Sequence, residues 1–156
     1  MWSTVIAVFG TLAGAALAGL TAHWTDRRAR AAEHDQRVRD TAAQLLAASL
    51  AYRELFWLQL ADLRNGEPPS REGRAAVYRA RSEVTQAFDR LVLTASDPHL
   101  VDAALEAAWS AIDLSDIVLG EVHDQRFGEE VEAALAAGRT RSRDAHTALR
   151  DAARAR

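Results

Sequence analysis

The sequence predicts an all-α protein: one N-terminal transmembrane helix that continues into a long helix, plus an antiparallel bundle of three or four cytoplasmic helices. Apolar residues recur at spacings of three and four over much of the 156-residue chain, the period of helices with one buried face. Aromatic residues make up only 6% of the chain and runs of β-branched residues are few, which argues against a β-sandwich or barrel. The first charged side chain is Asp26, so the N-terminal segment is apolar.

A helix over Ser3–Ala22 is long enough to cross a membrane. These residues carry no strongly polar side chain. At about 1.5 Å per residue they match a hydrocarbon core of roughly 30 Å, so we expect residues 1–25 to form a transmembrane anchor. Two alternatives stay open. Ala16-Leu17-Ala18 resembles a signal-peptide cleavage triplet, and the alanine- and glycine-rich run could instead pack in the core of a soluble bundle.

The residues at the two ends of this run predict its orientation. Trp2 and Trp24 flank it, and indole rings prefer the membrane interface. Arg27, Arg28 and Arg30 follow it, whereas only the terminal amine precedes it. The positive-inside rule then places the N-terminus outside the cytoplasmic membrane and the rest of the chain in the cytoplasm, with membrane lipid as a partner of the anchor.

A groove of small residues runs along the predicted anchor. Gly10 and Gly14 form a GxxxG motif, and Ala18 continues the spacing of four. Such a groove lets a second membrane helix pack closely, which would make the protein a homo-oligomer through its membrane helix. The alternative is that an alanine-rich span produces this spacing by chance.

Residues 26–40 alternate in charge and are expected to form a solvated helical stalk with pairs four residues apart. Residues 41–156 are expected to form the cytoplasmic bundle. The first buried face belongs to a helix that ends at Asn65-Gly66. Its residues are Val38, Ala42, Leu45, Ser49, Tyr52, Phe56, Leu60 and Leu63.

Three more helices follow. The second begins at about Arg71, the third begins at Pro98 with Ser96-Asp97-Pro98 as its cap, and the fourth begins near Glu129. The expected buried face of the second helix is Val77, Val84, Phe88, Leu91 and Ala95. That of the third helix is Val101, Leu105, Ala108, Ile112, Leu119 and Val122. That of the fourth helix is Val131, Leu135, Gly138, Ala145 and Leu149. The large side chains available to the core are Tyr52, Phe56, Trp57, Tyr78, Phe88 and Trp109.

The charges are unevenly distributed around a formal net charge of −3. Residues 97–132 carry ten acidic side chains against Arg126, and arginine dominates from Arg139 onward. We interpret this as complementarity between neighbouring helices. The alternative gives the acidic surface a basic protein partner and the arginine-rich tail an anionic lipid or nucleic acid. The negative net charge and the lack of aromatic residues after Phe127 disfavour nucleic acid.

The residue types exclude several kinds of chemistry. The chain has no cysteine and all 19 of its basic residues are arginine, which excludes thiolate metal sites and the catalytic uses of cysteine and lysine. No metal-ligand spacing, nucleophile elbow or phosphate loop is present, so no catalytic residue, cofactor or metal site is expected. The side chains of His34, His99 and His146 are expected to be exposed to solvent.

Arg53 and Glu54 interrupt an otherwise apolar stretch. They either lie on the solvent side of an amphipathic helix or are buried. A buried Arg53 would need an opposite charge, for which Asp113 and Asp116, three residues apart, are the candidates.

Met1-Trp2-Ser3, Val5-Ile6-Ala7-Val8, Gly10-Thr11-Leu12 and the segment from Tyr52 to Trp57 resemble the KilB-type proteins of filamentous actinobacteria, which are connected with the spread of conjugative plasmids. The resemblance is clearest over the anchor and stalk. Beyond Asn65 it is limited to an alternation of alanine-rich helices. It implies a cytoplasmic-membrane protein associated with plasmid transfer, with no catalytic residue to carry over.

These observations predict a non-catalytic, membrane-anchored component that binds other proteins and that acts, by its resemblance, in plasmid spread. Its protein partner is not identified by the sequence. The alternative is a soluble or peripheral helical subunit or regulator whose first helix packs in a protein core.

Overall fold

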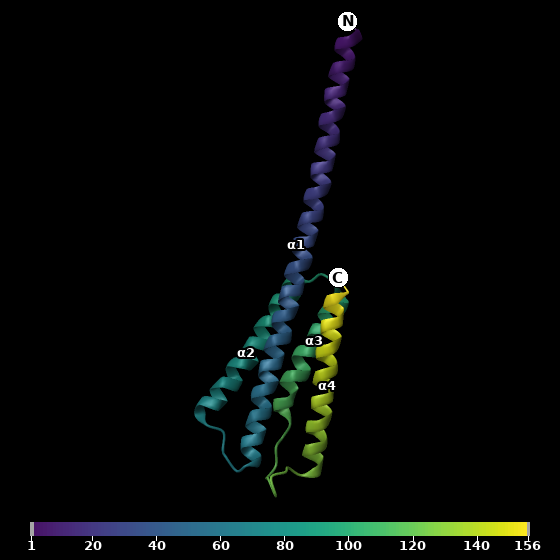
Figure 1. The fold of residues 1–156 in the computed structure, drawn as a ribbon. Coiled ribbons are helices and arrows are strands. Elements are labelled where there is room, and N and C mark those ends of the chain that lie inside the picture. Colours follow the sequence, from purple (N-terminus) through teal and green to yellow (C-terminus); the bar gives the residue numbers. More distant parts are fainter. Residues whose placement is uncertain (1, 156) are drawn as a thin grey trace. The chain divides into compact units, whose positions relative to one another are not determined.

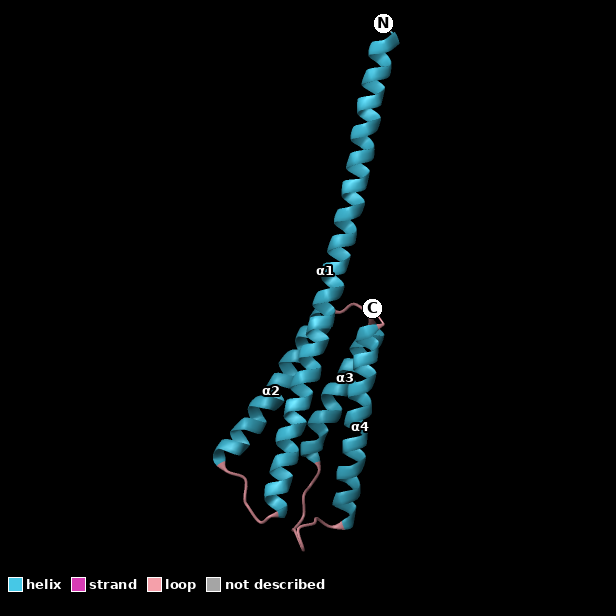
Figure 2. Ribbon diagram, viewed as in Figure 1, coloured by secondary structure: helices cyan, strands magenta, loops and turns pink. Residues whose placement is uncertain are grey.

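The structure of this chain is a computed structural model that describes the backbone of residues 2–155 and the side chains of residues 23–155 (Figure 1). Its elements are α1 (Trp2–Arg64), α2 (Arg71–Thr94), α3 (Pro98–Ile112), the short 3-10 helix η1 (Asp113–Asp116) and α4 (Glu129–Arg154). The described residues contain no β-strand, which confirms the all-α class (Figure 2). The chain forms two compact units, residues 1–37 and residues 38–156.

The first unit is the N-terminal part of α1. The side chains of residues 23–34 are exposed, Trp24 to 62%. Asp26 pairs with Arg30, and Glu33 with Arg37, so the expected pairs four residues apart are present. In both pairs the acid precedes the base, the more favourable order on a helix.

Within residues 23–155, no helix has a stretch that is long and apolar enough to cross a membrane. The side chains of the predicted span Ser3–Ala22, including Gly10, Gly14 and Ala18, lie outside the described residues, as does that of Trp2. Arg27, Arg28 and Arg30 are described and exposed. The membrane-spanning character of the N-terminal segment therefore stays a prediction.

The second unit is a bundle in which successive helices run antiparallel (Figure 1). Its main core joins α1, α2, α3 and α4 through fully buried side chains such as Leu45, Val84, Leu100 and Leu149. Seven of the eight residues expected on the first buried face are at most 6% exposed, namely Val38, Ala42, Leu45, Ser49, Tyr52, Phe56 and Leu60. The eighth, Leu63, is partly buried. The face predicted for this helix is confirmed.

Local signals end and begin the helices as expected. After Arg64, Gly66 adopts a φ of 81°, and the amides of Gly66 and Glu67 donate to the carbonyls of Leu63 and Asp62. This is a Schellman motif, which needs the left-handed conformation that glycine adopts most readily. The Asp97 carboxylate accepts from the His99 amide and Pro98 opens α3, which confirms the cap predicted there.

The third helix differs from its prediction in both length and face. It ends at Ile112, so Leu119 and Val122 lie in the following loop. Its buried face is formed largely by alanine (Leu100, Ala104, Ala107, Ala108, Ala111 and Ile112), whereas Leu105 is 41% exposed. The physical reason is that alanine lets neighbouring helices approach closely, and α3 is apolar on more than one side.

Two of the large side chains expected in the core are exposed instead. Tyr78 is 68% exposed and Trp109 40% exposed, so their assignment to the core was wrong. Neither belongs to the buried face of its helix, which smaller residues such as Ala80 in α2 and Ala107 and Ala108 in α3 help to form. Trp109 packs its ring at 6.2 Å from that of Phe88, which is partly buried.

A second apolar cluster lies where α1 ends and α4 begins. Its buried members are Phe56, Leu60, Leu114, Phe127 and Leu135, and the loop side chains Leu119 and Val122 pack against it. The loop turns back at Asp124 and Gln125, both of which have positive φ. This cluster fixes the connection that leads into α4.

Candidate binding groove

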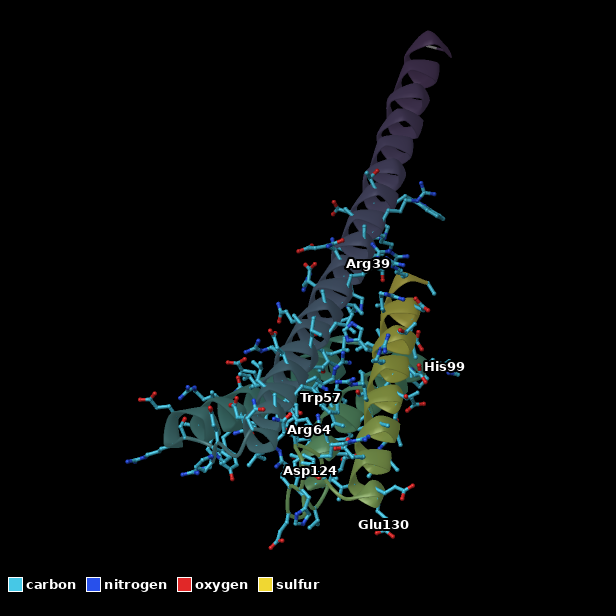
Figure 3. The ribbon with its side chains drawn as sticks, turned by 60° about the horizontal axis from the view of Figure 1, so that its bottom comes forward. Arg39, Trp57, Arg64, His99, Asp124 and Glu130 are labelled. Atoms are coloured by element: carbon cyan, nitrogen blue, oxygen red, sulfur yellow. The ribbon has the colours of Figure 1, made fainter. Side chains whose placement is uncertain are left out.

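A groove lined by arginine and apolar side chains lies between α1 and α4 within the bundle. It consists of two hollows of about 380 and 370 Å³. Leu50, Arg53, Glu54, Trp57, Arg139, Ser142 and Arg143 line the first, and Trp57, Arg64, Glu132, Leu135, Ala136, Arg139 and Thr140 line the second. Because Trp57 and Arg139 belong to both, the two hollows adjoin. Trp57 and Arg64 are labelled on α1 in Figure 3.

The centre of the groove is a stack of Arg139 on Trp57. The guanidinium carbon of Arg139 lies 4.2 Å from the centre of the Trp57 ring, within the range of a cation–π interaction. The rings of Trp57 and the buried Phe56 pack at a steep angle, with their centres 5.4 Å apart. Trp57 is therefore held in place from α1 while its own ring stays partly accessible in the groove.

Arg53 forms one wall of the groove and is partly buried. Its guanidinium donates to the backbone carbonyl oxygen of Ser142 on α4 at 3.0 Å. Burial and the nearby positive charge of Arg143 lower the pKa of Arg53. Arg53 and Arg143 therefore lie close enough to repel one another.

Three arginines of the groove lack an acidic partner in the part of the chain whose side chains are described. Among the described residues, Arg53, Arg139 and Arg143 form no ion pair with a carboxylate. A guanidinium presents several N–H donors in a planar fork that matches a carboxylate or a phosphate. The groove consequently presents cationic N–H donors from which an anionic group can accept hydrogen bonds.

The far end of the groove is closed by an ion pair. Arg64 donates to both oxygens of Glu132, at 2.9 and 2.8 Å. The Phe127 amide also donates to Glu132, and this bond, together with Arg64, lowers the pKa of the Glu132 carboxyl. The pair ties the end of α1 to the first turn of α4.

The structure gives separate partners to the residues singled out from the sequence for a buried ion pair. Arg53 bonds to the Ser142 carbonyl, whereas Asp113 accepts from Arg141 at 2.9 Å. Asp116 is exposed, and Glu54 lies on the solvent side of α1. The contact that holds Arg53 is thus made by a backbone carbonyl of α4 rather than by a carboxylate of α3 or η1.

Arg141 shows how the acidic and basic regions fit together. Besides Asp113, it binds Glu106 of α3 through both carboxylate oxygens, at 2.7 and 3.1 Å. Its hydrogen bonds lower the pKa of Glu106, and the two acidic partners raise the pKa of Arg141. These contacts have the geometry expected from charge complementarity between α3 and α4.

His146 is partly buried, contrary to the expectation of an exposed ring, because it lies beside the buried face of α4. Its Nδ1 atom is buried without a hydrogen-bond partner among the described residues. Burial, Arg53 and Arg150 lower its pKa. No three His, Asp or Glu side chains in the part of the chain with described side chains gather closely enough to hold a metal ion.

The sequence contains a signal for the groove that the search for chemical motifs missed. Arg139, Arg143, His146 and Arg150 recur at spacings of four, three and four, which places them along one side of α4. Trp57 was expected in the core and is instead shared between core and groove.

Fold and groove together define the class: an all-α bundle protein with a long first helix and an arginine-lined groove between its first and last helices. The model of the KilB plasmid transfer protein family matches residues 39–156, so the chain belongs to this family. It is 42% identical over 92 residues to Protein KilB of Streptomyces lividans, an alignment that covers 54% of this chain and 59% of that relative. The alignment thus spans less than two thirds of the relative's length. No solved structure matches the chain.

Proposed function

We propose that this protein is a non-catalytic component of plasmid transfer that is anchored in the cytoplasmic membrane by residues 1–25 and binds other proteins through its helical bundle. Membership of the KilB family supports a plasmid-associated role. The observation that carries the binding role is the groove between α1 and α4, which exposes three arginines that lack a carboxylate partner among the described residues. The apolar run Ser3–Ala22 followed by Arg27, Arg28 and Arg30 supports the anchor.

Two further parts of the proposal concern assembly and orientation. The GxxxG spacing of Gly10 and Gly14, continued by Ala18, favours self-association of the membrane helix. The arginines after the span favour an N-terminus outside and a bundle in the cytoplasm. The competing proposal is a soluble or peripheral subunit or regulator whose first helix packs in a protein core, which the high alanine and glycine content of that segment favours.

The proposal is tested in plasmid-bearing cells that express the full chain or a variant lacking residues 2–25. We expect the full chain to stay with membranes after a carbonate wash, because lipid surrounds its apolar segment. The shortened variant should appear in the wash and should lower the frequency of plasmid transfer. Gly10→Ile with Gly14→Ile should reduce cross-linking between copies in the membrane.

Release of the full chain by carbonate would favour the competing proposal. Normal transfer by the shortened variant would show that the anchor has no role in plasmid transfer.

A further inference from the structure

We propose that the groove between α1 and α4 binds an acidic amphipathic helix of a protein partner. This inference rests on the proposed function and specifies the partner's chemistry. The first observation in its favour is the charge of the residues that border the groove. Arg53, Arg139 and Arg143 border the first hollow together with Glu54, so the arginines are in excess there. Arg53 and Arg143 both line this hollow, and the positive charge of Arg143 lowers the pKa of Arg53, so an anionic side chain bound there would be attracted to both.

The apolar residues of the groove distinguish a peptide from other anions. Leu50 is 51% exposed at one end, Trp57 lies in the middle, and Ala136 is exposed at the other end. Apolar side chains of a bound helix would cover these surfaces while acidic side chains on its flanks reach the arginines. Grooves that bind amphipathic helices usually have this arrangement, with apolar contacts inside the groove and charged contacts at its rim.

The shape and remaining charges disfavour a phosphate chain. Glu54 and Glu132 border the groove. A helix can place its few acidic side chains away from these two carboxylates, whereas a nucleic-acid backbone carries a negative charge at every nucleotide. Trp57 is the one aromatic ring among the lining residues, and Arg139 stacks on it. Successive bases therefore have no series of rings on which to stack.

The length of the groove along α1 determines the length of the partner segment that it can hold. The groove follows α1 from Leu50 to Arg64. At 1.5 Å per residue this is about 21 Å, which corresponds to a partner helix of about 14 residues, or four turns. The ion pair of Arg64 with Glu132 closes one end and would mark the limit of the bound segment.

The test uses the full chain in detergent micelles and fluorescence anisotropy with labelled synthetic peptides of about 14 residues, the length of four helical turns. The first peptide carries leucine on one face and glutamate on the flanks. In the second, lysine replaces glutamate, and in the third, serine replaces leucine. A single-stranded oligothymidylate and vesicles of phosphatidylglycerol are measured in parallel.

We expect the first peptide to bind most tightly. Arg139→Glu combined with Arg143→Glu should weaken its binding by about tenfold or more, because two attractive charges become repulsive. The matched control is Arg79→Glu combined with Arg90→Glu, which makes the same change in net charge at exposed positions of α2 and should leave binding nearly unchanged. Circular dichroism melting reports the fold of each variant. If the reversal variant unfolds, Arg139→Gln with Arg143→Gln replaces it and should also weaken binding.

The inference is overturned by several results. These are failure of the first peptide to bind, equal binding by the groove and control variants, tighter binding of the lysine peptide or the oligothymidylate, and binding to the vesicles that the groove variant loses while the control variant keeps it. None of them changes the carbonate and transfer measurements described above, so a failure of the groove and a failure of the proposed function are distinguishable.

Discussion

At the scale of single residues, charge and burial act together around the groove. Arg53 keeps its charge in a partly buried position because a carbonyl oxygen of α4 accepts its hydrogen bond. His146 lies under the influence of Arg53 and Arg150, and its Nδ1 atom is buried. A proton on this ring would add a positive charge to a region that already has several. The neutral form of His146 is therefore the one that the folded state favours.

This preference predicts a pH dependence of stability. The pKa of His146 is lowered in the folded protein relative to about 6.5 in the unfolded chain. Above the pKa of the unfolded chain, His146 is neutral in both the folded and the unfolded state, so its burial does not reduce the free energy of unfolding. As the pH falls below that value, the unfolded chain binds the proton first and the free energy of unfolding decreases.

Urea unfolding at a series of pH values from 7.5 downward checks this prediction. Wild type should lose stability relative to His146→Gln as the pH falls below the unfolded pKa of about 6.5. His34→Gln, at an exposed position of α1, serves as the control and should behave as wild type. A constant difference between wild type and His146→Gln at all pH values would contradict the prediction.

At the scale of elements, the sequence predicts the buried face of α1 well and the buried face of α3 poorly. In α1 large apolar residues such as Leu45, Phe56 and Leu60 recur on the predicted face, so the periodicity identifies the buried side even though Leu50 and Leu58 lie exposed outside it. In α3 both the alanine face and the side with Leu105 and Trp109 are apolar. The volume of the side chains, rather than their hydrophobicity, therefore decides which side packs against the core. The wrong assignment of Trp109 to the core follows from the same ambiguity.

The groove could not be predicted in the same way because its walls are far apart in the sequence. Arg53 and Ser142 are separated by 89 positions. The spacing of Arg139, Arg143, His146 and Arg150 predicts a basic stripe on α4, but nothing local indicates that α1 supplies Trp57 beside it. Pairing of helices depends on the packing of the whole core.

The contact between α4 and η1 yields a prediction about packing. Gly138 lies so near Leu114 that an added Cβ atom would be 2.7 Å from a methyl carbon of that buried side chain. Gly138→Val should reduce the free energy of unfolding by about 2 kcal/mol, because the core has no room for the added methyl groups. The neighbouring Ala137→Val, on the exposed side of α4, should cost only about 0.6 kcal/mol through helix propensity. Equal losses in urea unfolding would contradict this account.

At the scale of the whole molecule, topology is the property that the proposed function most depends on. The chain has no cysteine, so a single introduced thiol reports its own side of the membrane. Cysteine inserted after Met1 should react with a membrane-impermeant maleimide in intact cells, because the arginines after the apolar run retain the opposite end inside. Ser96→Cys, at an exposed position between α2 and α3, should react only after permeabilisation. Labelling of Ser96→Cys in intact cells would contradict the orientation.

The groove draws one wall from α1 and the other from α4. During synthesis the two walls emerge from the ribosome at different times, with α2 and α3 between them. Until α4 has left the exit tunnel and docked, Trp57 has no arginine above it and Arg53 has no carbonyl to hold it. A nascent chain would therefore be unable to bind the proposed acidic helix before its last helix has been synthesised.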